Sequence, residues 1–110
     1  MAIFDFDGTL TPLAPTPEAA HLSRRGRGLI ARLSRNARVQ VAVVSGRALR
    51  DLRARVRVAG VVYGGCHGLE IAGPGLRFRH PRARAASVAR VNRRLVTGAQ
   101  AIPGARVEWK

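Results

Sequence analysis

Two aspartates stand close together near the start of the chain, in the segment DFDGT at residues 5–9. They follow the apolar run Ala2–Phe4, so their carboxylates leave the end of a predicted buried strand, where open α/β sheets bind ligands. One carboxylate can act as a nucleophile and the other as an acid and a base. In phosphoryl transfer, Asp5 would attack phosphorus, while Asp7 would protonate the leaving alcohol and later deprotonate the hydrolytic water. The alternative is that both aspartates are solvated loop residues.

These two neighbouring carboxylates also require a cation to offset their mutual repulsion. Mg²⁺ prefers near-octahedral oxygen ligands, of which one or two are carboxylates and the others are phosphate, carbonyl and water oxygens. The sequence therefore predicts a magnesium site that uses Asp5 and Asp7.

A second group of residues, Ser45, Gly46 and Arg47, stands between the apolar run Val39–Val44 and a segment with helical spacing. Backbone N–H groups at a helix N-terminus form an anion site, and the Ser45 hydroxyl can add a direct phosphate contact. Ser45 can equally be an ordinary helix cap. Because the carboxyl ends of parallel strands lie at the same edge of a sheet, this group and the aspartates are expected to converge on one phosphate.

Alternating apolar runs and helical patterns predict the elements that position these residues. Short apolar runs predict strands at Ala2–Phe4, Val39–Val44 and Gly60–Tyr63. Helical spacing predicts one helix from Thr16 to about Arg35 and another after Ser45-Gly46. The order β-α-β-α-β implies a parallel sheet with right-handed crossovers. Further along, we expect a hairpin at Leu69–Ala72 and Leu76–Arg79, a helix from Arg84, and a last extended segment at Arg106–Lys110.

The composition fits a single soluble α/β domain. The chain has 110 residues, of which 46% are apolar, and no apolar run approaches the roughly 18 residues of a membrane span. Two acids among the first residues argue against a signal peptide, so we expect a cytoplasmic protein without a membrane partner. Cys66 is the only cysteine, so no internal disulfide can form.

The formal net charge of +14 is the strongest compositional signal, and such a charge attracts nucleic acid or phosphorylated metabolites. Lys110 is the only lysine, and the arginines are spread along every segment, which favours a solvated surface over a dedicated basic arm. The sequence lacks the interleaved aromatics that are typical of nucleic-acid-binding proteins. A basic nucleic-acid-binding module is therefore kept only as the weaker alternative.

The first motif and Ser45 resemble those of the haloacid dehalogenase (HAD) superfamily, and longer segments resemble its trehalose-6-phosphate phosphatase family. The string GGxHGxE at residues 64–70 discriminates best, because other HAD phosphatases generally lack it. The matching segments are FDFDGTL with Pro12, VVSGR at residues 43–47, YGGCHGLEI at residues 63–71, and PG with VExK at residues 103–110.

The resemblance implies a partial HAD-like Rossmannoid core at residues 1–80 and the beginning of an α+β cap at residues 81–110. It implies Mg²⁺-dependent hydrolysis of trehalose 6-phosphate through an aspartyl phosphate, with another sugar phosphate, such as sucrose phosphate, as the alternative substrate. The implied catalytic residues are Asp5 and Asp7. Phosphate-binding residues would be Thr9, Ser45, Gly46 and Arg47, and substrate-binding residues would be His67, Gly68, Glu70, Glu108 and Lys110.

The residues of the GGxHGxE string can also have purely structural roles, and the chain lacks some residues of the family's active site. The glycines of the GGxHGxE string can serve a tight turn, His67 can be a surface or core histidine, and Glu70 can be a strand-edge charge. No acid occurs between Glu70 and Glu108, where the family places the later acids of its magnesium site, and a later basic residue is missing as well. We therefore expect a fragment that is weakly active or inactive alone, with the missing C-terminal half of the phosphatase as its partner.

Overall fold

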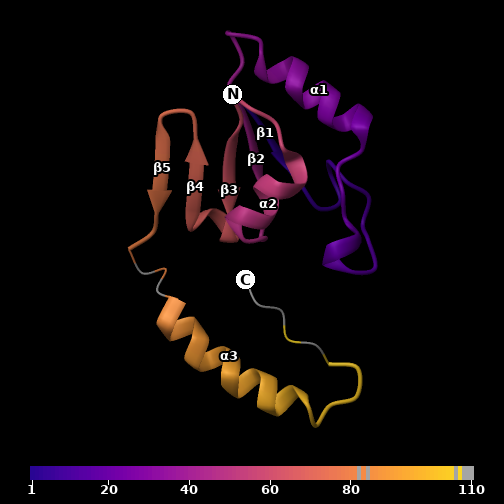
Figure 1. Cartoon of the computed structure of the whole chain (residues 1–110), viewed down its shortest axis with the longest axis vertical. Coiled ribbons are helices and arrows are strands. Elements are labelled where there is room, and N and C mark those ends of the chain that lie inside the picture. The colour runs from indigo at the N-terminus through magenta and orange to yellow at the C-terminus, as the bar shows by residue number, and fades with distance from the viewer. Residues whose placement is uncertain (82, 84, 106, 108–110) are drawn as a thin grey trace. The chain divides into compact units, whose positions relative to one another are not determined.

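The computed structural model describes residues 1–81, 83, 85–105 and 107 (Figure 1). The chain divides into two compact units, Met1–Arg79 and His80–Lys110. The first unit contains every candidate site residue that the structure describes. Among the described residues, no helix is both long enough and apolar enough to cross a membrane.

The first unit is built on a mixed sheet of five strands, which lie side by side in chain order. Its first three strands are parallel, and the last two add an antiparallel hairpin. This confirms the predicted α/β class and the β-α-β-α-β order of the first part. The strands are β1 (Ala2–Asp5), β2 (Val41–Val44), β3 (Val62–Gly65), β4 (Glu70–Gly73) and β5 (Leu76–Arg79).

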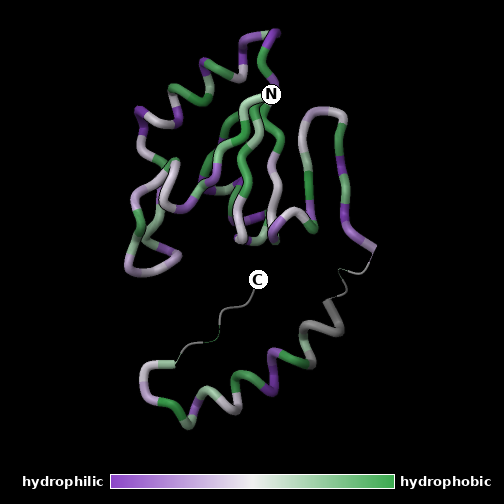
Figure 2. The backbone as a smooth tube through the Cα atoms, turned by 180° about the vertical axis from the view of Figure 1, so that it is seen from behind, coloured by the Kyte–Doolittle hydropathy of each residue, from purple (hydrophilic) through white to green (hydrophobic). Residues whose placement is uncertain are grey.

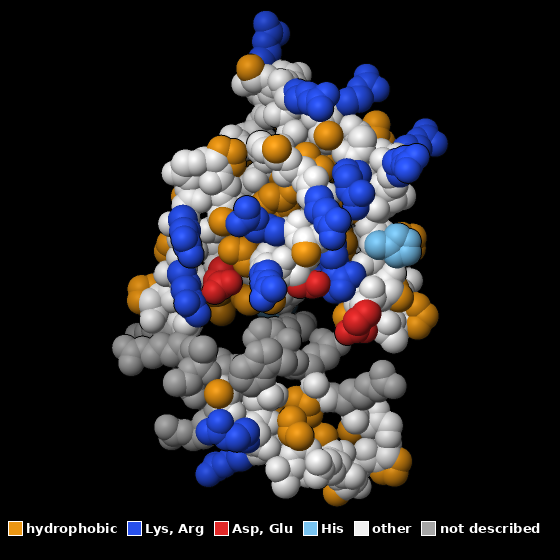
Figure 3. All heavy atoms as spheres, viewed as in Figure 1, with side chains coloured by type: hydrophobic (Ala, Val, Ile, Leu, Met, Phe, Trp, Pro, Cys, Tyr) orange, Lys and Arg blue, Asp and Glu red, His pale blue; other side chains and the backbone are white. Residues whose placement is uncertain are grey.

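Two helices, α1 (Arg24–Ser34) and α2 (Leu49–Val56), pack on this sheet. α1 contacts β2, while α2 contacts β3 and β4 (Figure 1). Arg27 of α1 donates hydrogen bonds of 3.1 and 3.0 Å to the carbonyls of Arg55 and Val56 at the end of α2. A cation at this position offsets the negative end of the helix dipole, so Arg27 has a structural role. Other arginines are spread over the visible face of the first unit (Figure 3).

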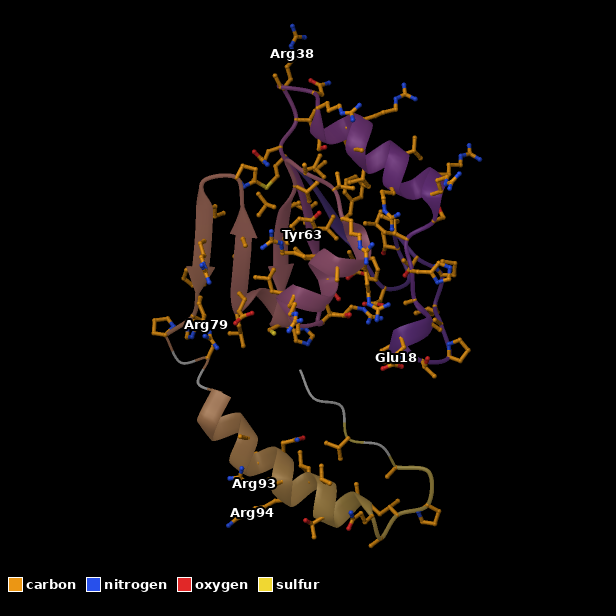
Figure 4. The ribbon with its side chains drawn as sticks, viewed as in Figure 1. Glu18, Arg38, Tyr63, Arg79, Arg93 and Arg94 are labelled. Carbon is orange, nitrogen blue, oxygen red and sulfur yellow. The ribbon has the colours of Figure 1, made fainter. Side chains whose placement is uncertain are left out.

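The core lies between the helices and the sheet. β1 and β2 are hydrophobic over most of their length, whereas β5 alternates hydrophobic and hydrophilic residues (Figure 2). The Tyr63 hydroxyl is satisfied inside the core by donating to the Val58 carbonyl at 2.6 Å (Figure 4). On the opposite face, Ile3 and Val44 keep 61% and 37% of their surface exposed within the first unit. The core is therefore one-sided. Its largest fully buried side chains are Phe6, Val41, Val43, Leu52, Val56 and Val61.

The prediction of one helix from Thr16 to about Arg35 is wrong at its start. The structure has a short 3-10 turn, η1 (Pro17–Ala19), then an extended segment, and α1 begins only at Arg24. Ser23 caps α1 by accepting a hydrogen bond of 3.0 Å from the Gly26 N–H. Burial decides the break, because the extended segment places the side chain of Leu22 in the core with 3% of its surface exposed.

The second unit contains the helix α3 (Ala85–Ala99), which confirms the helix predicted from Arg84. Val91 and Leu95 lie on its surface, each with 56% of its area exposed. Arg93 and Arg94 project from the same helix (Figure 4). The predicted final strand falls at residues 106–110, of which only Val107 is among the described residues.

Candidate active site

Three loops meet at the carboxyl ends of the parallel strands. The register of the sheet pairs Asp5 with Val44, so the loops that follow β1 and β2 begin side by side. The Phe6 N–H donates to the Val44 carbonyl at 3.1 Å, and the Ser45 N–H donates to the Gly64 carbonyl at 2.9 Å. The two motifs thus lie at one edge of the sheet, as the sequence predicted.

Asp7 is held by two residues of the loop that follows β2. The Nε and Nη2 atoms of Arg47 donate to Oδ1 of Asp7 at 3.1 and 2.7 Å, and Nε also lies 3.0 Å from Oδ2. The Ser45 hydroxyl donates to Oδ2 at 3.0 Å. The hydrogen bonds from Arg47 lower the pKa of Asp7, burial opposes this shift, and the Ser45 hydroxyl lowers the pKa further. Asp7 is therefore ionised at neutral pH.

Asp5 has a different environment. Its side chain is exposed, and within the described residues its carboxylate makes no hydrogen bond or ion pair. Its main-chain carbonyl accepts a hydrogen bond of 3.3 Å from the Leu10 N–H. A carboxylate without a partner at the end of a strand is accessible to an incoming electrophile or cation. Of the two aspartates, only Asp5 has both oxygens available for chemistry.

The loop between the two motif aspartates and α1 is closed by a threonine that the sequence did not single out. Thr11 is 2% exposed, and its hydroxyl and N–H both donate to the Phe6 carbonyl, at 3.1 and 3.0 Å. Thr9, the predicted phosphate ligand, is exposed on the same loop and makes no hydrogen bond within the described residues. Thr11 therefore shapes the loop, and Thr9 stays available to a ligand.

The oxygen donors of this loop can be matched to those that Mg²⁺ requires. The Asp5 carboxylate and the Asp7 main-chain carbonyl are available, whereas the Asp7 carboxylate is engaged by Arg47. Among the described residues, no group of three or more His, Cys, Asp or Glu side chains is arranged to hold a metal. The donor set suits a hydrated Mg²⁺ that also binds phosphate, since this ion takes one or two carboxylates and keeps several waters.

The loop after β3 places His67 beside Ser45 and Gly46. The Cys66 N–H donates to the Arg47 carbonyl at 2.7 Å, and the His67 N–H donates to the Ser45 carbonyl at 3.2 Å. Cys66 and His67 both adopt left-handed backbone angles, with φ of 50° and 54°, which these contacts must compensate. The His67 ring lies against Gly46, where an added Cβ would stand 2.6 Å from Cε1. Gly46 therefore leaves the space that the imidazole occupies.

The remaining predicted substrate residues are dispersed. Gly68 follows His67 with a positive φ of 87°, and an added Cβ there would contact nothing within 4 Å. Glu70 begins β4 and forms an ion pair of 3.2 Å with Arg79 on β5. Because β4 lies between β3 and β5, Glu70 is not on an edge strand. Glu108 and Lys110 lie outside the described residues.

Two charged residues of α2 belong to the same cluster, although the sequence motifs did not include them. Asp51 accepts a hydrogen bond of 3.0 Å from Nη1 of Arg47, and Arg55 donates to Asp51 at 2.9 Å. The Arg47 guanidinium also lies 5.5 Å from the centre of the Phe6 ring. The spacing of Arg47, Asp51 and Arg55 at intervals of four residues was the available signal, because residues four apart are neighbours on a helix.

Gly65 sets the distance between β3 and the start of α2, which begins at Leu49, after the segment 45–47. A Cβ at this position would lie 2.5 Å from the backbone N and Cα of Leu49. We expect Gly65→Ala to lower the free energy of unfolding by about 1–3 kcal/mol, since backbone atoms cannot move aside as a side chain can. Gly28→Ala is the control, because an added Cβ there meets nothing and should stabilise α1 by about 0.5–1 kcal/mol. Urea unfolding of both variants measures the difference, and equal stabilities would contradict the close contact.

The ion pairs of this cluster predict how stability depends on pH. Burial raises the pKa of Asp51, but hydrogen bonds from Arg55 and Arg47 outweigh it, so the folded pKa values of Asp51 and Asp7 both lie below the ordinary value of an aspartate. Their stabilising contribution is complete above the unfolded pKa and is lost as pH falls through the folded values. Urea unfolding should therefore show that the free energy of unfolding falls between pH 6 and pH 2, and that it falls less steeply in Asp7→Asn. Glu18→Gln removes a carboxylate without an ion pair and should keep the original slope.

The comparisons with known proteins agree with this arrangement. The family model described as Trehalose-phosphatase matches residues 3–110, almost the whole chain. The chain belongs to the trehalose-phosphatase family.

Two curated relatives show how much of a family member the chain represents. It is 42% identical over 110 residues to a trehalose-phosphate phosphatase of Mycolicibacterium paratuberculosis, a match that covers 97% of this chain and 28% of the relative. It is 39% identical over 85 residues to the trehalose-phosphate phosphatase of Mycobacterium tuberculosis H37Rv, covering 77% of this chain and 21% of the relative. The chain thus spans less than a third of the length of these relatives.

Solved structures of the family support the fold. The Candida albicans trehalose-6-phosphate phosphatase C-terminal domain superposes with a TM-score of 0.82 at 25% identity, over 98% of this chain and 38% of that domain. A trehalose-6-phosphate phosphatase related protein superposes with a TM-score of 0.85 at 20% identity, over 99% of this chain and 47% of its own. The mixed sheet and its helices are therefore those of trehalose-phosphatase structures.

Proposed function

We propose that the chain carries the nucleophile and phosphate-binding half of a phosphatase that hydrolyses trehalose 6-phosphate to trehalose and phosphate. The observation that carries this proposal is the meeting of Asp5, Asp7 and the Ser45–Arg47 loop at one edge of the sheet. The family supports the choice of substrate, because the relatives that match are trehalose-phosphate phosphatases. By the same resemblance, residues 1–80 would be part of the core domain and residues 81–110 the beginning of a cap.

In the first step, an Asp5 carboxylate oxygen attacks phosphorus while the bond from phosphorus to the sugar oxygen breaks. Asp5 suits this role because its carboxylate is exposed and makes no ion pair within the described residues. The departing sugar oxygen takes a proton from Asp7, which completes the alcohol. For this step Asp7 must first gain a proton on one oxygen, and its other oxygen can still accept a hydrogen bond from Arg47.

In the second step, water attacks the aspartyl phosphate, and the bond between phosphorus and the Asp5 oxygen breaks. Asp7 accepts a proton from this water, so that phosphate is released and the Asp5 carboxylate is restored. The ion pair with Arg47 favours the ionised form of Asp7, which is the form that can accept the proton. The two aspartates therefore have separate roles that follow from their different environments.

Substrate phosphate would be held by the loops around the two aspartates. Ser45, Thr9 and the main chain at Gly46 offer hydrogen-bond donors, and Arg47 offers a guanidinium already placed beside Asp7. The Asp5 carboxylate and the Asp7 main-chain carbonyl would bind Mg²⁺, which supplies positive charge against the phosphate when it is bound. His67 and Gly68 would border the sugar, and the family pattern adds Glu70, Glu108 and Lys110.

The test is release of phosphate from three sugar phosphates by this chain extended with the later segment of the Mycolicibacterium paratuberculosis relative. Trehalose 6-phosphate should be hydrolysed with the highest kcat/KM, and sucrose 6-phosphate and glucose 6-phosphate should be poor substrates. An equal or higher kcat/KM for sucrose 6-phosphate would assign the site to another sugar phosphatase. Binding to DNA of any sequence at low salt, with an affinity that falls steeply as the salt concentration rises, would instead favour the nucleic-acid alternative if it survives Asp5→Asn.

A further inference from the structure

A continuous chain of charged contacts runs from Asp7 to the segment before α1. Arg47 bridges Asp7 and Asp51, with Nη2 2.7 Å from Asp7 and Nη1 3.0 Å from Asp51. Asp51 also receives the Nε of Arg55, which lies 2.9 Å from each carboxylate oxygen. Nη1 of Arg55 in turn donates to the carbonyls of Ala20 and Glu18, at 2.6 and 3.1 Å.

The two arginines are better protected from solvent than the acids they contact, since the side chains of Asp7 and Asp51 are 37% and 39% exposed. The Arg47 side chain is 10% exposed and that of Arg55 is 19% exposed, so neither guanidinium can rely on water alone for its hydrogen bonds. Asp51 is the only carboxylate among the described residues that contacts both of them. An isolated buried charge is costly, whereas a charge with fixed partners is tolerated. Asp51 therefore satisfies two cations that the fold has already partly removed from solvent.

The geometry also restricts how Arg47 can move. Arginine has a long side chain with several rotatable bonds, and holding it in one conformation costs conformational entropy. Here the guanidinium has an acid on two sides and the Phe6 ring 5.5 Å away. Without Asp51, the contact with Asp7 would be the only remaining ion pair of Arg47, and its end would be freer to rotate.

We propose that Asp51, braced by Arg55, is a positioning residue that holds Arg47 against Asp7 and so fixes the orientation of the Asp7 carboxylate. The placement of Arg47 stands on the contacts alone, and the consequence for catalysis rests on the proposed function. Asp51 would touch neither substrate nor phosphate. It would affect the reaction only through Arg47, which contacts Asp7 although the two residues are 40 positions apart in the sequence.

The first experiment measures the Arg47 side chain in the 110-residue chain itself, by NMR of its Nε–H group. In the original protein this proton should exchange slowly with water, and its NMR relaxation should indicate a rigid side chain. Asp51→Asn should speed its exchange at least about tenfold, because each lost ion-paired hydrogen bond frees the guanidinium. Glu18→Gln, which removes one negative charge from a side chain without an ion pair, is the matched control and should change nothing. Asp51→Glu should restore slow exchange, since it returns a carboxylate to both arginines.

An unchanged Nε–H signal in Asp51→Asn would overturn the proposal. If Asp51→Asn does not fold, Arg55→Gln supplies the same test, because it removes the hydrogen bonds from Arg55 to Asp51 and leaves the Asp51 carboxylate in place. Exchange of the Arg47 Nε–H should then become faster, by a smaller factor than in Asp51→Asn. An unchanged exchange rate would again overturn the proposal.

The second experiment separates positioning from the proposed function. In the extended phosphatase, Asp51→Asn should lower kcat about ten- to a hundredfold with a smaller change in KM, since misplaced catalytic groups slow the chemical step. Asp51→Glu should recover most of this loss, and Glu18→Gln should behave as the original. Absence of phosphatase activity in the original extended chain would reject the proposed function and leave the NMR result to decide the placement of Arg47. A normal kcat in Asp51→Asn would reject the catalytic consequence.

Discussion

Replacing Asp5 with Asn is expected to abolish phosphatase activity in the extended chain, by a factor of at least about 10³ in kcat. An amide is a poor nucleophile and cannot form the aspartyl phosphate, and the same change removes the available carboxylate that would bind Mg²⁺. Because the Asp5 side chain makes no hydrogen bond or ion pair within the described residues, the loss should occur without a large fall in melting temperature. Phosphate release and thermal melting of the same preparation measure both quantities.

A companion variant tells the two aspartates apart. Asp7→Asn should be nearly as damaging with a sugar phosphate, but an activated substrate whose leaving group needs no proton should still phosphorylate Asp5. The intermediate should then persist, because the hydrolytic water has lost its base. Mass spectrometry of the trapped protein locates the phosphate. A covalent phosphate on any residue other than Asp5 would refute the assignment of the nucleophile.

The second large effect is expected when the later segment of the family is supplied. The 110-residue chain alone should be catalytically poor, because the loop after β1 offers one free carboxylate and one main-chain carbonyl against a phosphate of nearly two negative charges. Each missing transition-state contact of a few kcal/mol costs a factor of about 10²–10³. Adding the later segment of the Mycolicibacterium paratuberculosis relative, in cis or as a separate chain, should raise turnover by at least that factor.

The same addition should also stabilise the fold. β1 is one of the two edge strands of the described sheet, and Ile3 and Val44 expose apolar surface on the face that α1 and α2 do not cover. Covering apolar surface and pairing an edge strand both favour the folded state. Thermal melting at saturating Mg²⁺, with and without the segment, measures the expected rise in melting temperature. The control is an unrelated domain of equal length fused at the same place. Full turnover by residues 1–110 alone would contradict the argument for an incomplete site.

Local sequence patterns determined most of the elements that carry the site. The apolar run Ala2–Phe4 and the β-branched run at Val39–Val44 indicated neighbouring parallel strands, and the motifs that follow them were placed correctly at one edge of the sheet. Such patterns succeed because the alternation of buried strands and helices is set by residues close together in the chain. The GGxHGxE string likewise indicated the family, which the match over residues 3–110 shows.

The partners of the charged side chains were decided only by the tertiary structure. Asp7 and Arg47 meet across 40 positions, and Arg55 reaches the Ala20 carbonyl across 35, so no local pattern could pair them. The late start of α1 has the same origin, because burial of Leu22 outweighs a helix signal that begins at Thr16. A sequence shows which groups can ionise and which segments can form strands. The distances between those groups, and therefore which carboxylate is engaged by Arg47 and which is left available, depend on packing between elements that are far apart in the chain.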